Sequence, residues 1–134
     1  MTVAIGMTTD LWMLLYSVLL AFVLVLVPAT EGILKLGMGP FLTNRDEMPD
    51  MTVWNKRACR TRDNSLENLA LFAPLVLIAH VSGNAGDQTA LGATIFFWSR
   101  VAHAIVYLAG IAYVRTLAWA GGVIGMALIA AALF

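Results

Sequence analysis

Residues 11–30 read LWMLLYSVLLAFVLVLVPAT, twenty consecutive positions without a charged side chain. An α-helix rises about 1.5 Å per residue, so this stretch is long enough to cross a hydrocarbon core of about 30 Å. Residues 68–86 and 116–134 also lack Asp, Glu, Lys and Arg, and residues 91–114 contain only Arg100. These apolar runs are too continuous for barrel strands, which alternate apolar and polar residues. We therefore predict an all-α membrane protein, a bundle of four transmembrane helices over residues 10–37, 54–82, 89–114 and 117–134.

The composition of the whole chain supports a membrane protein. Of its 134 residues 60% are hydrophobic and 12% are charged, whereas an average soluble domain has about 45–50% and about 25%. The apolar content excludes a disordered chain, and eight basic residues balanced by eight acidic ones argue against nucleic acid as a partner. The length fits a single membrane domain, residues 1–134. The lone Cys59 excludes an intramolecular disulfide and a multi-cysteine metal site, and no metal is predicted.

The basic residues are unevenly distributed over the predicted loops. No Lys or Arg precedes Lys35, and the connection after the second helix, residues 82–90, contains none. Six basic residues lie in or beside the first connection: Lys35, Arg45, Lys56, Arg57, Arg60 and Arg62. Cytoplasmic loops of membrane proteins are enriched in Lys and Arg. We therefore predict that the first connection is cytoplasmic and that both termini lie outside the cytoplasm.

Two rows of polar residues lie where lipid should exclude them. Spacings of three, four and three residues place one row along the second helix: Arg57, Arg60, Asn64 and Glu67. Spacings of three and four place the other along the third helix: Arg100, His103 and Tyr107. A charge at the centre of a spanning helix costs about 2.5–3.5 kcal/mol, so it normally faces the bundle interior, a watery cavity or a partner subunit. We expect the two rows to face each other, with Glu67 near Arg100 or an adjacent arginine.

Each of these residues also has an ordinary structural explanation. Flanking charges or topology anchors would account for Arg57, Arg60 and Arg115, and a structural ion pair for Arg100 with Glu67. Packing or interfacial placement would account for His103 and Tyr107. The excess of positive charge favours a ligand-binding site instead, because four arginines lie in this part of the chain with a single glutamate, Glu67. Guanidinium groups bind carboxylates in bidentate geometry, so the pattern predicts a cavity for a small, multiply charged anion.

Residues 57–74, RACRTRDNSLENLALFAP, resemble the second helix of the MAPEG family, the membrane-associated proteins of eicosanoid and glutathione metabolism. The family pattern is an arginine, an asparagine four residues on, a glutamate three beyond it and a proline further into the membrane. The residues that match it are Arg60, Asn64, Glu67 and Pro74. Residues 100–107, RVAHAIVY, resemble the third helix of the family, particularly that of prostaglandin E synthases. The resemblance extends over the whole chain.

This resemblance implies a homotrimer that binds glutathione between neighbouring subunits. By resemblance, Arg60, Asn64 and Glu67 would hold the charged ends of glutathione, and the cavity would be completed by Arg57, Arg100, His103 and Tyr107. Arg115 would be the catalytic residue that stabilises the thiolate, which is the nucleophilic form of the thiol. The implied function is glutathione transfer to hydrophobic electrophiles that arrive from membrane lipid, with or without peroxidase activity. The implied location is the bacterial inner membrane.

Two other functions fit the same sequence. A non-catalytic member of this fold would bind a lipid or another ligand in the cavity and would not turn over a model electrophile. A small four-helix exporter has about this length, but that class centres on an acidic residue in the first helix that faces a cation. Glu31 lies too far toward the cytoplasmic end for that role, where it is either a flanking charge or part of the polar site. The surplus of arginine also disfavours a cationic substrate.

Overall fold

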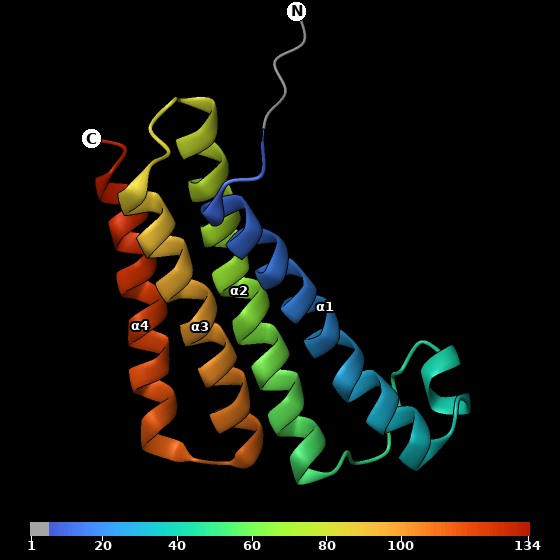
Figure 1. The fold of residues 1–134 in the computed structure, drawn as a ribbon. Coiled ribbons are helices and arrows are strands. Elements are labelled where there is room, and N and C mark those ends of the chain that lie inside the picture. Colours follow the sequence, from blue (N-terminus) through green and yellow to red (C-terminus); the bar gives the residue numbers. More distant parts are fainter. Residues whose placement is uncertain (1–5) are drawn as a thin grey trace, which may run out of the picture.

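The computed structural model describes residues 6–134. It contains four long helices, α1 (Thr9–Leu36), α2 (Val53–Val81), α3 (Asp87–Ala109) and α4 (Ala112–Ala131), and a short 3₁₀ helix, η1 (Gly39–Leu42), in the first connection (Figure 1). α1 begins and α4 ends at one end of the bundle, which we call the N/C end (Figure 1). The first connection and the α3–α4 turn lie at the other end, which we call the loop end.

The outward faces of the helices are suited to lipid. Each of the four helices is long and apolar enough to cross a membrane, which confirms the predicted four spanning helices. Large apolar side chains point outward from each of them, and four examples between 60% and 73% exposed are Phe22, Leu71, Ile105 and Leu117. Because monomeric soluble proteins rarely expose continuous apolar surface of this kind, the surface is one that lipid or a further subunit covers.

The observed helix ends agree with the predicted ones to within two or three residues, except at the α3–α4 connection. The prediction of helices over 89–114 and 117–134 is wrong there, because α3 ends at Ala109 and α4 begins at Ala112. Gly110 stops α3 in the left-handed conformation, with φ of 81°, and the amide of Ile111 donates to the Val106 carbonyl at 2.9 Å. Glycine is the usual residue at such a cap because it lacks a Cβ. Arg115 therefore lies in the first turn of α4 instead of in the link.

α3 and α4 have the most extensive contact of any pair of helices. A Cβ added at Gly125 would lie 2.5 Å from the Gly92 carbonyl oxygen, and one added at Gly92 would lie 2.6 Å from the Gly125 oxygen. The pair Gly121 and Gly125 has the GxxxG spacing that permits close helix contact in membranes. A Cβ added at Gly121 would lie 2.4 Å from the Ser99 Oγ, so both glycines of this pair face α3 at close range.

The apolar core lies toward the N/C end of the bundle. It is formed by side chains from α2, α3 and α4, and its buried members are Phe72, Val76, Ala79, Ala93, Phe96, Met126 and Ile129. The rings of Phe72 and Phe96 stack at its centre, with centroids 3.8 Å apart and planes inclined by 12°. Closer to the loop end, the same three helices turn polar side chains toward each other. α1 packs on α2 and α3 and does not contact α4.

Candidate functional site

The four polar residues predicted to form one row on α2 form two pairs that differ in burial. Arg57 and Asn64 are seven residues apart, so they point in nearly the same direction, and both are half-buried against the bundle. Arg60 and Glu67 are also seven residues apart, and both are exposed on the outside of the single chain. A step of three residues on a helix rotates the side chain by about 60° from a full turn. This rotation places the two pairs on adjoining faces instead of on one.

Arg100 lies at the centre of the inward-facing group. Its side chain is only 3% exposed, and its aliphatic part packs beside Gly122 of α4. One nitrogen, Nη2, donates to the Asn64 Oδ1 at 2.6 Å. The other two, Nε and Nη1, are buried without a hydrogen-bond partner among residues 6–134. A buried guanidinium with two unused donors is a group that a bound anion would complete.

The expected ion pair between Glu67 and an arginine is not formed. Among the described residues the ion pairs are Arg62 with Asp63 and His80 with Asp10, and Glu67 takes part in neither. Arg100 reaches across to Asn64, one step nearer the loop end, and the rotation between positions 64 and 67 turns the Glu67 carboxylate outward. The prediction that α2 and α3 face each other through these rows is correct for Asn64 and wrong for Glu67.

Asn64 is held in place from within its own helix. The side-chain amide of Asn68, which is buried, donates to the Asn64 carbonyl at 2.8 Å and to the Asn64 Oδ1 at 3.3 Å. The Asn64 Oδ1 therefore accepts from Asn68 and from Arg100 together. This geometry fixes the Arg100 side chain relative to α2, so its unused donors have a defined direction.

His103, Tyr107 and Arg115 continue the group toward the loop end. The Arg100 Nη2 lies 3.4 Å from the His103 Nδ1, and because a guanidinium nitrogen only donates, this imidazole nitrogen accepts. The His103 and Tyr107 ring centroids are 5.4 Å apart, and the Arg115 guanidinium carbon lies 4.9 Å from the centre of the Tyr107 ring. These contacts link three helices, α2, α3 and the first turn of α4, into one cluster, which we call the Arg100 cluster: Asn64, Arg100, His103, Tyr107 and Arg115.

An open pocket of about 290 Å³ lies beside this cluster. Its walls are Asn64, His103, Tyr107, Arg115, Thr116 and Trp119, and none of these carries a carboxylate. Thr116 and Trp119 were not singled out from the sequence. Their positions relative to Arg115 could have indicated them. Thr116 directly follows Arg115, and Trp119 is four residues after Arg115, so it lies one turn further along α4 on the same face.

Arg57 lies at the end of α3 instead of in the pocket. Its Nη1 donates to the Leu108 carbonyl at 3.4 Å, and a Cβ added at Gly110 would lie 3.0 Å from the Arg57 guanidinium carbon. A cation at the C-terminus of a helix is stabilised by the free carbonyl groups and the helix dipole. In this chain Arg57 holds α2 against the turn that leads into α4.

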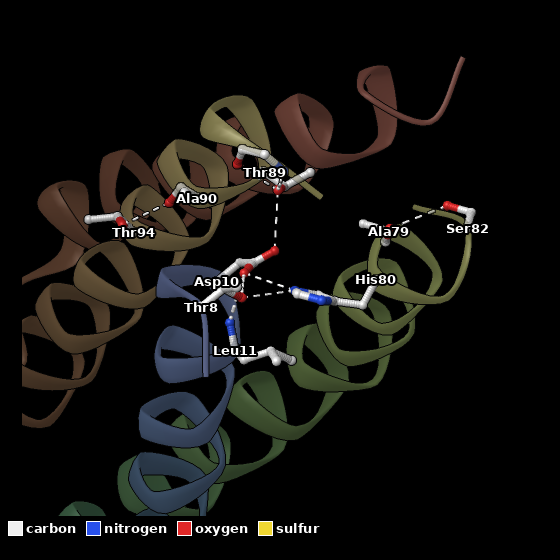
Figure 2. A network of polar contacts seen from close by, with 10 residues as sticks. Thr8, Asp10, Leu11, Ala79, His80, Ser82, Thr89, Ala90 and Thr94 are labelled. Carbon is white, nitrogen blue, oxygen red and sulfur yellow. Dashed lines mark hydrogen bonds and ion pairs between the residues drawn. The ribbon is translucent and has the colours of Figure 1, made fainter. Parts of the chain in front are cut away.

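A second buried polar cluster lies at the N/C end (Figure 2). The Asp10 carboxylate, 2% exposed, accepts from the Leu11 amide at 3.1 Å, the Thr89 hydroxyl at 3.2 Å, the His80 imidazole at 2.9 Å and the Thr8 hydroxyl. His80, near the end of α2, is therefore held inside the bundle by Asp10 and Thr8. This cluster joins the ends of α1, α2 and α3. Both oxygens of the Asp10 carboxylate have partners in it.

The comparison with known families agrees with the resemblance seen in the sequence. The model of the MAPEG family matches residues 12–134, nearly the whole chain. The chain belongs to the MAPEG family. No curated protein and no solved structure gave a significant match.

In this MAPEG protein the predicted site residues form two groups. Five of them meet in the Arg100 cluster, Arg60 and Glu67 face outward from α2, and Arg57 belongs to neither group because it contacts the end of α3. No set of three His, Cys, Asp or Glu side chains that could hold a metal ion is found in the described part of the chain. The cluster offers cations, a pocket and no carboxylate, which suits an anionic ligand.

Proposed function

We propose that this protein is an integral membrane glutathione transferase that acts as a homotrimer in the bacterial inner membrane, with both termini outside the cytoplasm. The observation that carries the proposal is the state of Arg100, a buried cation with two guanidinium nitrogens unpartnered among residues 6–134. Glutathione has two carboxylates, and a carboxylate that accepts from those donors would complete the site.

The outward-facing residues of α2 support a site shared between copies of the chain. Arg60 and Glu67 are exposed on the single chain, although they belong to a helix that crosses the membrane. Charged groups on a membrane-spanning helix normally face another protein surface or a watery cavity. A ligand bound between two copies would contact the Arg100 cluster of one and Arg60 with Glu67 of the other, where Glu67 would accept from the ammonium group.

The pocket contains groups suited to activating a thiol. A cysteine thiol has a pKa of about 8.5, so most of it is protonated at neutral pH, and a neighbouring guanidinium favours the thiolate. Arg115 borders the pocket and would stabilise the sulfur anion, with the Thr116 hydroxyl beside it. The thiol proton would leave to water. The thiolate would form a sulfur–carbon bond as the electrophile's leaving group departs with its electron pair.

An apolar groove next to the pocket supports a hydrophobic second substrate. It has a volume of about 450 Å³, lies between α2 and α4, and has Leu71, Pro74, Val123 and Met126 among its walls. Val123 is one helical turn from Trp119, which lines the pocket, so the groove and the pocket follow each other along α4. A hydrophobic electrophile that enters from the bilayer would thereby reach the thiolate without passing through water.

The proposal is tested by glutathione binding and turnover in detergent or nanodiscs. We expect calorimetry to detect glutathione binding and the wild type to conjugate chlorodinitrobenzene. Arg60→Ala should lower kcat/KM by about tenfold or more, the effect of one charge-assisted contact. Arg62→Ala is the matched control, because Arg62 lies on the same helix but pairs with Asp63 at the surface.

The possible results separate the proposal from its rivals. Lack of glutathione binding, together with equal activity of Arg60→Ala and Arg62→Ala, would refute the transferase. Binding of glutathione or a lipid in the pocket without turnover would identify a non-catalytic ligand-binding protein instead.

A further inference from the structure

Glu31 lies at the place where α1 leaves the hydrocarbon core. It directly follows the charge-free residues 11–30, which span about 30 Å as a helix, the thickness of that core. A carboxylate at this depth is close to the lipid head groups. It is also at the loop end of the bundle, remote from the N/C-end cluster of Asp10.

The Glu31 carboxylate is held by neutral donors and by no cation. Its Oε1 accepts from the Thr52 hydroxyl at 3.0 Å, and its Oε2 accepts from the Asn55 side-chain amide at 2.5 Å. Asn55 is 1% exposed, and its amide also donates to the Pro28 carbonyl at 2.9 Å, which fixes its orientation. No ion pair within residues 6–134 involves Glu31. The negative charge is therefore positioned without being neutralised.

An apolar groove of about 420 Å³ leads along α1 to this carboxylate. Its walls include Val23, Leu26 and Leu34 of α1 and Trp54 of α2, and Glu31 is its only ionisable lining group. From position 23 to position 34 it follows α1 for about 16 Å. The groove thus combines an alkyl-lined channel with a single anionic end, and we call it the Glu31 groove.

We propose that the Glu31 groove binds an aminophospholipid of the surrounding leaflet. One acyl chain would lie along α1 against Leu26 and Trp54, and the primary ammonium would pair with the Glu31 carboxylate. Lys35, exposed one turn further along α1, is within reach of the lipid phosphate. A phospholipid is the occupant favoured by the chemistry, because the groove is open to the bilayer and its charge complements an amine. The proposal depends on the membrane location and not on the transferase activity.

Trp54 gives a direct readout of the groove. It is 38% exposed and lines the groove, so a brominated acyl chain lying there quenches its fluorescence. The test variant retains Trp54 and replaces Trp12, Trp98 and Trp119 by Phe. It is reconstituted in phosphatidylcholine vesicles that contain an equal fraction of either brominated phosphatidylethanolamine or brominated phosphatidylglycerol.

We expect the amine lipid to be enriched at Trp54 by about two- to fivefold over the glycerol lipid, the range for one partly exposed ion pair. Glu31→Gln should abolish the preference. The matched control is Glu47→Gln, which removes a carboxylate from the exposed first connection and should leave the preference unchanged.

Three outcomes would overturn the proposal. Equal quenching by both lipids means that the groove holds only unselected annular lipid. Preference for the glycerol lipid means that the basic residues of the loop end, and not Glu31, govern the contact. Absence of quenching by either lipid means that a second copy of the chain covers the groove.

Native mass spectrometry of the wild-type chain is the second measurement, in case the single-tryptophan variant does not fold. Detergent-solubilised protein is mixed with equal amounts of the two lipids, and the retained lipid is identified by mass. We expect phosphatidylethanolamine to be retained two- to fivefold more than phosphatidylglycerol, and that ratio should fall to about one in Glu31→Gln. An unchanged ratio in that variant would refute the role of the carboxylate.

Discussion

The two buried polar clusters of this protein differ in how fully their hydrogen-bonding groups are satisfied. At the N/C end, both oxygens of the Asp10 carboxylate have partners, which come from α1, α2 and α3 (Figure 2). In the middle of α3, closer to the loop end, Arg100 has one partnered nitrogen and two without partners in the described chain. Leaving a buried donor unpaired costs about 1–3 kcal/mol, and more for a charged group. A satisfied cluster therefore holds helices together, whereas an unsatisfied one marks a place for a ligand.

The largest effect is expected from the cation that borders the pocket. Arg115→Ala should lower kcat for glutathione conjugation by about 10²- to 10³-fold, because a preorganised group that stabilises a developing anion is lost. Glutathione affinity should change much less, since Arg100 remains. The measurement is steady-state kinetics with chlorodinitrobenzene, and Arg62→Ala again serves as the control. A variant that keeps full kcat would show that Arg115 only stacks on Tyr107.

The next effect concerns the satisfied cluster. Asp10→Asn replaces the carboxylate that four donors share, and it should lower the free energy of unfolding by about 2–3 kcal/mol. Thermal unfolding in detergent measures this loss, and Asp46→Asn, in the exposed first connection, should leave the midpoint unchanged. Glutathione binding per folded protein should stay the same. A weaker affinity with normal stability would contradict a structural role.

The smallest effect has the opposite sign and tests the unsatisfied cluster. Replacing buried charge by an apolar residue of similar volume is often neutral or stabilising. Arg100→Met should therefore raise the free energy of unfolding of the ligand-free protein by about 1–2 kcal/mol and remove the rise in Tm that glutathione produces. Arg62→Met, at a partly exposed position outside the Arg100 cluster, should keep that ligand-dependent rise. Destabilisation by Arg100→Met would show that the guanidinium serves the fold and not a ligand.

The spans were predictable because lipid excludes charge along a whole helix. Twenty uncharged residues before Glu31 were enough to place α1 to within one residue at each end. The α3–α4 boundary differs from the predicted one, because the charge pattern predicts a link at residues 115–116 and the glycine cap at Gly110 ends α3 earlier. Local backbone conformation, and not the position of the nearest charge, determines where a spanning helix stops.

The site was only partly predictable. Helical spacing identified Arg100, His103 and Tyr107 on one face, and these residues do lie together. The same argument placed Glu67 beside Arg100, although a rotation of about 60° separates positions 64 and 67. The contact between Asp10 and His80 had no signal in local spacing, since seventy residues separate them.

Periodicity and charge placement thus specify the helices, their order and the faces that hold polar residues, because these properties depend on neighbours within a few residues of the same helix. Which polar residues find hydrogen-bond partners depends on contacts between helices. Asn64 meets Arg100, Arg57 meets the end of α3, and Asp10 meets Thr89 only after the four helices have packed. Between α3 and α4 the packing depends on Gly92 and Gly125, where no room is left for a Cβ. The residue pattern of one helix does not specify how closely a second helix approaches it.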